Sequence, residues 1–284
     1  MDVNEAIQDA NRSPLLSGRW EEGPQNTHAP SDFSAVRAIY LDLDDTLCGY
    51  WDASKAGLRR ALELEGPPGY TVEECVKAWA TAFRDFAPTL KKTGWYEGYL
   101  KLAEPTRTEQ MRRMLSVLQI VDEERAQRLS EAYLRERDAA LTLFEDALEV
   151  ITKLRERYPL GLITNGPADL QRMEVATLGL EAFFDPILIE GEMGEGKPKP
   201  SVFKRAAELM KCGPSQLLMV GNSYNHDVLP ALEAGWKAIW IRRPSDVPPS
   251  SEHVDPKPEE KPHDQPEPDA VINDLRSLLT LLPA

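Results

Sequence analysis

Short apolar runs alternate with amphipathic segments along the second half of the chain. Residues 159–164, 186–189, 216–220 and 237–241 are four such runs, each about as long as a buried strand, with helical periodicity between them. A fifth run, Ala38–Leu41, stands near the start of the chain. Strands that alternate with helices pair in parallel, so the pattern predicts an α/β fold built on a parallel sheet.

The stretch 48–142, which separates the first run from the others, is too long for a loop and has helical periodicity. Thr71 and Glu74 form a capping-box signature before a predicted helix over 72–86. Further helical patterns cover 110–119 and 123–140. The sequence therefore predicts an all-helical domain, 48–142, inserted into a core domain made of 33–47 and 143–284.

Two segments lack an apolar pattern. Residues 1–32 are rich in Asn, Ser, Pro and Gly and predict a flexible leader. Residues 243–269 are crowded with Pro, Ser and acidic side chains and predict a solvated loop within the core domain. Order returns in 270–282, where we expect a last short strand and a helix.

Charge and cysteine content narrow the partners of such a protein. Forty-seven acidic and 33 basic residues give a formal charge of −14, which disfavours nucleic acid and anionic lipid as partners. No stretch is apolar enough over the length of a membrane span. The three cysteines are widely spaced and lack a C-x-x-C pair, which favours a cytoplasmic setting. An anionic substrate would need local cations or a metal ion.

Candidate chemistry begins where the first apolar run ends. Asp42 and Asp44 stand two residues apart, so an extended chain directs both carboxylates to the same side at the carboxyl end of the strand. Ligands bind at that end in open α/β sheets. A calcium loop is excluded, because Leu47 and Ala53 occupy the positions that require Gly and Glu. A solvated acidic turn remains an equally good interpretation of this hexapeptide taken alone.

Three further polar turns stand after or between the later runs. Thr164-Asn165-Gly166 offers a hydroxyl and free backbone N–H groups, although an ordinary strand-to-helix turn has the same composition. Lys197 lies in Gly-Lys-Pro-Lys-Pro, where Pro198 replaces the Ser or Thr that a nucleotide-binding loop needs, and a plain Pro-stiffened loop is the alternative. The turn 221–227 ends in Asp227, which also suits a helix amino terminus.

In this order and spacing, the four segments resemble the motifs of the haloacid dehalogenase-like (HAD) hydrolase superfamily, most of whose members are phosphatases. The resemblance covers 36–282 and implies a Rossmann-like, doubly wound core with a helical cap. The finer likeness is to N-acylneuraminate 9-phosphatases and pyrimidine nucleotidases. The matching positions are Asp42-x-Asp44-x-Thr46 for the first motif, Thr164 for the second, Lys197 for the third and Gly221–Asp227 for the fourth.

The resemblance implies hydrolysis of a small phosphorylated metabolite, such as a sugar phosphate, a sugar-acid phosphate or a nucleotide. Asp42 is then the nucleophile that forms an aspartyl-phosphate, and Asp44 is the general acid and base, with a pKa raised by the charge of Asp42. Thr164, Asn165 and Lys197 hold the phosphate. Mg²⁺ is the implied cofactor, and its expected contacts are Asp42, the Asp44 carbonyl, Asn222 and Asp227.

Asn222 departs from the family pattern, because phosphatases of the family usually have an acidic residue there. An amide oxygen binds Mg²⁺ without adding negative charge, so we expect weaker metal binding. Two alternatives stay open: a metal-independent 2-haloacid dehalogenase, which Asp44 disfavours, and a catalytically weak binding protein on the same fold. Tyr50 and Trp51, which follow motif one, are candidates for substrate contact, although a packing role is more common for such residues.

Overall fold

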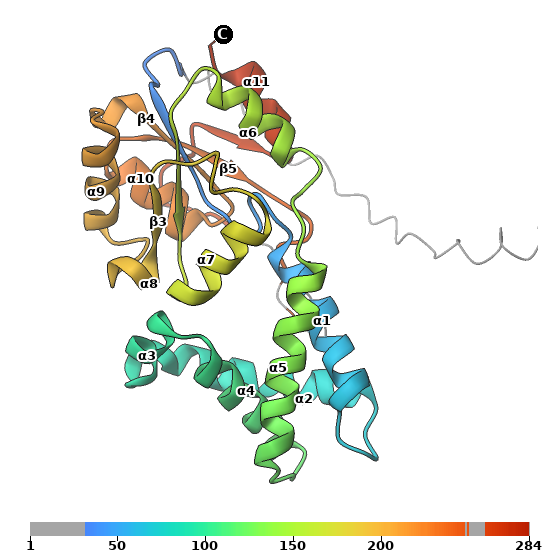
Figure 1. Ribbon diagram of the computed structural model, residues 1–284. Helices are drawn as coiled ribbons and strands as arrows, with labels where there is room; N and C mark the ends of the chain where they lie inside the picture. The colour runs from blue at the N-terminus through green and yellow to red at the C-terminus, as the bar shows by residue number, and fades with distance from the viewer. Residues whose placement is uncertain (1–31, 248, 250–258, 284) are drawn as a thin grey trace, which may run out of the picture. The chain divides into compact units, whose positions relative to one another are not determined.

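The computed structural model describes residues 32–247, 249 and 259–283. The predicted leader, apart from Asp32, and part of the predicted loop over 243–269 lie outside these residues. Within the described chain, one parallel sheet has the strand order β3-β2-β1-β4-β5-β6 (Figure 1). The strands are β1 (Ala38–Leu41), β2 (Leu160–Thr164), β3 (Ile187–Ile189), β4 (Leu217–Gly221), β5 (Lys237–Ile241) and β6 (Ala270–Ile272).

Helices cover both faces of the sheet, which confirms the predicted doubly wound α/β core. The core helices are α6 (Ala147–Arg155), α7 (Ala168–Thr177), α8 (Glu190–Met193), α9 (Pro200–Met210), α10 (Leu229–Glu233) and α11 (Leu278–Leu281), with short turns η2 (Pro214–Gln216), η3 (Tyr224–Val228) and η5 (Leu275–Ser277). Ile39 and Leu41 of β1 share an apolar cluster with α6, α7 and α11. Ala38 and Tyr40 share another with α9 and α10. This alternation follows from the two-residue period of a strand.

The order of the strands determines where a ligand can bind. From β1 the chain passes to β2 and β3 on one side and then crosses to β4 on the other. Strand order therefore reverses between β1 and β4, and in open α/β sheets a crevice forms outside the carboxyl ends at such a point. The residues that follow β1 and β4, from Asp42 and Asn222 onward, stand at this crevice.

Between β1 and β2 the chain forms a helical insert, residues 50–140. The insert has its own apolar cluster, to which Leu58, Trp79 and Met114 belong. The predicted capping box of Thr71 and Glu74 is present. Its elements are α1 (Tyr50–Glu65), α2 (Val72–Phe86), η1 (Ala87–Lys92), α3 (Trp95–Lys101), α4 (Glu104–Val117) and α5 (Glu123–Ala140).

Helix α4 begins well before the predicted start at residue 110. Pro105 stands in its first turn, where the missing N–H leaves no hydrogen bond unmade. Thr106 and Thr108 occupy buried positions of this turn, so no apolar period marks it in the sequence. Apolar periodicity therefore does not predict the first turns of this helix.

Part of the segment 243–269 docks on the core, against the prediction of a solvated loop, whereas residues 262–267 are exposed as predicted. Arg243 donates hydrogen bonds to both carboxylate oxygens of Asp146, each at 2.9 Å, and both side chains are buried. Glu259 accepts a hydrogen bond from the backbone N of Tyr224 at 2.8 Å. Charged side chains can dock when their partners replace water, which average composition does not reveal.

Candidate active site

The site residues predicted from the sequence come together in one pocket of 300 Å³ at the carboxyl edge of the sheet. Two of them follow β1, others follow β2 and β4, and one comes from the loop between α8 and α9. The fold thus joins segments that are far apart in the sequence. The pocket lining includes Asp42, Asp44, Thr164, Asn165, Lys197, Asn222 and Asp227.

Lys197 joins two of the carboxylates. Its Nζ donates to Asp42 Oδ1 and to Asp227 Oδ1, both at 2.6 Å, and all three side chains are buried. The backbone N of Ser223 donates to the other oxygen of Asp227 at 3.0 Å. Gly221 permits this arrangement, because a Cβ atom there would lie 2.3 Å from Asp227 Oδ2. A side chain at this glycine would displace Asp227.

Burial and charge oppose each other at Asp42. Burial raises the pKa of Asp42 to about 6, although Lys197 and a hydrogen bond from Thr46 act in the opposite direction. Burial also disfavours the charged form of Lys197, but Asp227 and Asp42 outweigh it and hold the lysine pKa above its usual value. At neutral pH the pocket therefore keeps an ammonium group beside a carboxylate.

Asp44 is held by Gln171, a residue that sequence analysis missed. Gln171 Nε2 donates to Asp44 Oδ2 at 3.0 Å, and Gln171 Oε1 accepts from Thr164 Oγ1 at 2.6 Å. Burial is the main reason why the pKa of Asp44 is raised to about 7, and the charge of Asp42 is second. The predicted like-charge effect is therefore present but is not the largest. A carboxyl group that titrates near neutral pH can both give and take a proton.

A buried ion pair connects this network to the helical insert. Gln171 Nε2 also donates to Glu174 Oε2 at 2.8 Å. The other oxygen of Glu174 lies 3.1 Å from Nη2 of Arg137, which belongs to α5 of the insert. Asp138 also forms an ion pair with the guanidinium group of Arg137. The insert thus contacts the core directly behind Asp44 and Thr164.

The side chain of Asn165 holds the backbone of Lys197. Its Oδ1 accepts from the backbone N of Lys197 at 2.8 Å, and its Nδ2 donates to the Lys197 carbonyl at 2.7 Å. Both polar atoms of this side chain are therefore engaged with the backbone of Lys197. The side chain of Asn165 thus fixes the loop that carries the lysine, and a contact with phosphate through the backbone N–H of Asn165 stays a prediction.

A carboxylate stands directly behind Asn222. Asn222 Nδ2 donates to Asp246 Oδ2 at 2.9 Å, and Asn222 Oδ1 lies 3.5 Å from Thr46 Oγ1. Burial raises the pKa of Asp246. The negative charge that sequence analysis found missing at Asn222 is thus supplied nearby, by the segment that was predicted to be solvated.

The donor set of this pocket suits a hard cation. In the part of the chain that the structure describes, no three or more His, Cys, Asp or Glu side chains are grouped to hold a metal ion by themselves. Mg²⁺, however, binds protein through one or two carboxylates and completes its shell with carbonyl oxygens, water and substrate phosphate. Asp42 and Asp227 share a single cation, Lys197, so their combined charge is only half neutralised. The residues present therefore fit Mg²⁺.

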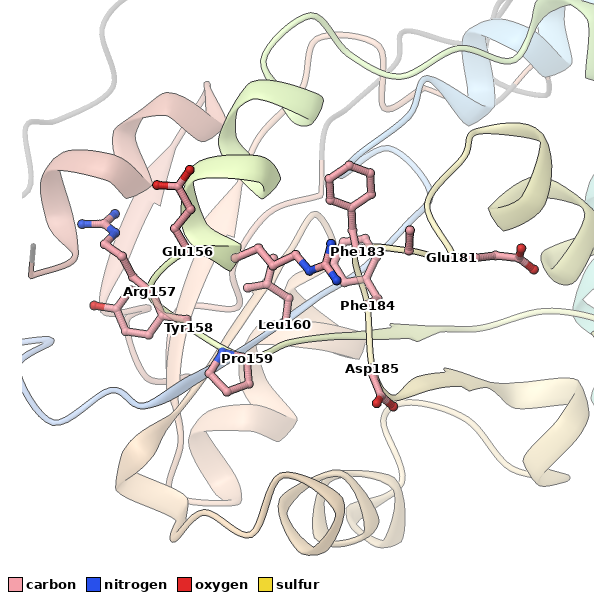
Figure 2. Close-up of a pocket in the computed structure, with 11 residues that line it drawn as sticks. Glu156, Arg157, Tyr158, Pro159, Leu160, Glu181, Phe183, Phe184 and Asp185 are labelled. Atoms are coloured by element: carbon pink, nitrogen blue, oxygen red, sulfur yellow. The ribbon is translucent and has the colours of Figure 1, made fainter.

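A larger hollow than the carboxyl-edge pocket lies at the opposite edge of the sheet. Figure 2 shows this pocket of 580 Å³, which Pro159 and Leu160 line at the amino end of β2. Glu156, Arg157 and Asp185 also line it, so charges of both signs alternate around it. It shares no lining residue with the carboxyl-edge pocket. None of the site residues predicted from the sequence lines this pocket.

One signal in the sequence could have revealed Gln171. Helix α7 buries Gln171, Glu174 and Val175 on one face. Two polar side chains three residues apart on a buried helix face need buried partners, and those partners lie in the site. Asp246 and Glu259 have no such signal, because they reach the site from a segment without periodicity.

Comparison with known proteins agrees with this geometry. The description haloacid dehalogenase-like hydrolase matches residues 36–235. The chain belongs to this family. A second description of the HAD hydrolases, HAD-hydrolase-like, matches residues 194–278. The chain is therefore a hydrolase, and the resemblance noted in the sequence is confirmed.

Two relatives cover most of the chain and are named as phosphatases. N-acylneuraminate-9-phosphatase of Rattus norvegicus is 29% identical over 219 residues, which are 76% of this chain and 86% of the relative. Phosphoserine phosphatase of Thermus thermophilus is 34% identical over 226 residues, which are 73% of this chain and 89% of the relative. The match thus extends across both the core and the helical insert.

Solved structures share the fold. The HAD-hydrolase YfnB from Bacillus subtilis, bound to magnesium, superposes with a TM-score of 0.65 at 19% identity and covers 88% of this chain and 99% of its own. L-2-haloacid dehalogenase from Xanthobacter autotrophicus gives 0.62 at 22% identity, with 87% and 98% covered. At these identities the likeness extends to the fold only.

Proposed function

We propose that this protein is a Mg²⁺-dependent phosphomonoester hydrolase that acts on a small phosphorylated metabolite through an aspartyl-phosphate. The observation that carries the proposal is the placement of Asp42 and Asp44 in one pocket with Lys197 and Thr164. A nucleophile, an acid and base, a buried cation and a hydroxyl are the groups that phosphoryl transfer requires. The phosphatase relatives support the same chemistry.

In the first step, a carboxylate oxygen of Asp42 attacks phosphorus while the bond from phosphorus to the leaving oxygen breaks. Asp44 gives its proton to that oxygen, so the leaving group departs as an alcohol. Lys197 offsets the negative charge on the phosphoryl oxygens. The hydroxyl of Thr164, which would turn from Gln171 to the phosphate, and the adjacent N–H groups hold them.

In the second step, Asp44 removes a proton from water, and the water oxygen attacks the phosphorus of the aspartyl-phosphate. The bond between phosphorus and Asp42 breaks, which releases inorganic phosphate and restores both carboxyl groups. Asp42, the Asp44 carbonyl, Asp227 and Asn222 would hold Mg²⁺. When bound, this ion supplies positive charge to the phosphoryl oxygens.

The proposal gives the helical insert the role of a cap over this pocket. The backbone N of Ala103 in the insert donates to Asp169 of α7 at 3.2 Å, and Tyr96 donates to Glu190 of α8. A cover of this kind would exclude water and select the substrate. We place the activity in the cytoplasm on the strength of three widely spaced, free thiols. Among the described residues, no helix combines the length and apolarity of a membrane span.

The test measures phosphate release from p-nitrophenyl phosphate and from a panel of phosphorylated metabolites, with Mg²⁺ and with a chelator. We expect Asp42→Asn to lower kcat by about 10⁴-fold or more, because it removes the nucleophile. Asp52→Asn is the matched control, since Asp52 is an exposed residue of α1 that pairs with Lys55.

Activity that survives both the chelator and Asp42→Asn would contradict the mechanism. Chloride release from 2-chloropropionate without metal would support the dehalogenase alternative. A well-folded protein that hydrolyses no member of the panel would favour the binding-protein alternative.

A further inference from the structure

A second pocket, of 220 Å³, is lined mostly by the helical insert, with Leu170 of α7 in its wall, and adjoins the catalytic pocket. Tyr50 and Trp51, the first two residues of α1, line both pockets. Trp79 and Phe83 of α2, stacked with their ring centroids 4.9 Å apart, form part of its wall. The wall is therefore mainly aromatic and continuous with the place where a leaving group must project from the phosphate.

Two guanidinium groups line this pocket, and their surroundings differ. Arg137 is buried and neutralised by Asp138 and Glu174. Arg107 of α4 is half-buried, and its Nε donates to Ser130, to the carbonyl at 3.1 Å and to Oγ at 3.0 Å. Among the described residues, no carboxylate forms a salt bridge with Arg107. Burial and the charge of Arg137 lower the pKa of Arg107, although the charges of Glu104 and Asp169 act in the opposite direction.

The lining of this pocket includes no Asp or Glu among the residues that the structure describes. In a chain with a formal charge of −14, a pocket with one unpaired cation and no acid is specialised for a negative group. A planar guanidinium matches a carboxylate in geometry and can bind it through two parallel hydrogen bonds.

Three of the lining side chains each have a buried polar atom. Trp79 Nε1, Thr106 Oγ1 and Gln110 Oε1 have no hydrogen-bond partner in the described part of the chain. Their side chains are 4%, 7% and 7% exposed. Buried polar groups without partners are rare. These three atoms have almost no accessible surface, so a molecule in the pocket would reach them only after a side-chain shift.

We propose that this pocket binds the leaving group of the substrate and that Arg107 binds a carboxylate of that group. The substrate is then a phosphate monoester of a carboxylic acid whose carbon skeleton packs on the aromatic wall. That the ester is a substrate rests on the proposed phosphatase activity, whereas binding of the free acid is independent of that activity.

The first test measures binding without catalysis. Quenching of tryptophan fluorescence reports on Trp51 and Trp79, and the probes are 3-phenylpropionate and its neutral amide, 3-phenylpropionamide. We expect the carboxylate to bind about tenfold more tightly than the amide, because it gains charge-assisted hydrogen bonds. Arg107→Gln should remove this difference and Arg107→Lys should restore part of it. Arg135→Gln, an exposed arginine of α5, should leave it unchanged.

The second test compares kcat/KM for 4-carboxyphenyl phosphate and 4-carbamoylphenyl phosphate. The ratio should favour the carboxylate in the unaltered protein and approach one in Arg107→Gln, mainly through KM. Equal binding of acid and amide, no binding of either, or a preference that persists in Arg107→Gln would overturn the proposal. Selective binding of the acid by a protein that hydrolyses no phosphate ester would support this pocket assignment and reject the phosphatase proposal. Hydrolysis of both esters at equal efficiency would support the phosphatase proposal and reject this pocket assignment.

Discussion

At the scale of single residues, Asp44 allows a sharp separation of roles, because it is distinct from the nucleophile. Asp44→Asn keeps the hydrogen bond with Gln171 possible but removes the proton donor and the base. We expect kcat for alkyl phosphates to fall by about 10²–10⁴-fold, since an alkoxide leaves poorly without a proton.

p-Nitrophenyl phosphate serves as the internal control, because nitrophenolate leaves without protonation. With this substrate we expect a burst of nitrophenol equal to the enzyme present, followed by slow turnover as the aspartyl-phosphate persists. Rapid-quench kinetics measure both phases. Turnover of alkyl phosphates by Asp44→Asn at the unaltered rate would show that Asp44 has no acid–base role.

Asn222 and Asp246 form a pair whose members can be exchanged. Asn222→Asp alone would face the Asp246 carboxylate across the present 2.9 Å hydrogen bond and should lower stability by about 2 kcal/mol. The double variant Asn222→Asp with Asp246→Asn restores the hydrogen bond with reversed polarity and should recover the melting temperature.

The same pair of variants tests the metal site. The exchange moves the negative charge to position 222 of the turn that ends in Asp227, so the double variant should need less Mg²⁺ for half-maximal activity. Magnesium titrations and thermal melts of the three proteins provide the comparison. An equal or higher metal requirement in the double variant would mean that Asn222 is not part of the metal shell.

At the scale of elements, helices α1 and α5 approach each other closely at Arg137 of α5. A Cβ atom at Gly57 of α1 would lie 2.6 Å from the backbone N of Arg137. Gly57→Ala must therefore push the two helices apart and should cost about 1–3 kcal/mol of stability. Because Arg137 pairs with Glu174 behind the site, kcat should fall as well.

Gly98 of α3 is the matched control, because a Cβ atom there would have no neighbour within 4 Å among the described residues. Gly98→Ala should be neutral or stabilise the protein by up to about 1 kcal/mol, since alanine favours the helix. Chemical denaturation measures both. Equal free energies of unfolding for the two variants would show that α1 and α5 can move apart without loss of stability.

At the scale of the whole molecule, Asp146 ties together segments from three parts of the chain. It binds Arg243 after β5 and accepts from the backbone N of Leu275 at 2.7 Å. Burial raises the pKa of Asp146, but the hydrogen bonds from Arg243 and Leu275 outweigh it, so the pKa lies below its usual value. A depressed carboxyl pKa stabilises the fold above the unfolded-state value of about 3.9 and loses this effect as pH falls through the folded-state value.

Asp146→Asn should therefore lower stability by about 3 kcal/mol at pH 7, because it leaves Arg243 buried without its partner. The difference from the unaltered protein should shrink as pH falls below about 4. Asp264→Asn is the control, since that side chain is fully exposed. Thermal melts between pH 3 and pH 8 give the profile, and a gap that widens toward acid pH would contradict this sign.

Local patterns account for what could be predicted from the sequence. Strands β1, β2 and β4 were predictable because each is a short run that is buried on both faces. Polar residues stand at or directly after their ends, and the place of these residues at the sheet edge follows from the parallel order. Gln171, Asp246 and Glu259 could not be assigned, because their roles depend on contacts with segments 24 to 127 residues away. Such contacts produce no periodic pattern in the sequence around these residues.

The position of β1 in the middle of the sheet has a consequence for how this family can change. Ile39 of β1 pairs with Leu160 of β2 across the whole helical insert. The free energy of closing such a loop grows only with the logarithm of its length, and a doubling adds about 0.6 kcal/mol. An insert of another size between the same two strands would therefore cost the sheet little. The site of phosphate chemistry and the part of the chain that selects the leaving group can thus diverge independently in evolution.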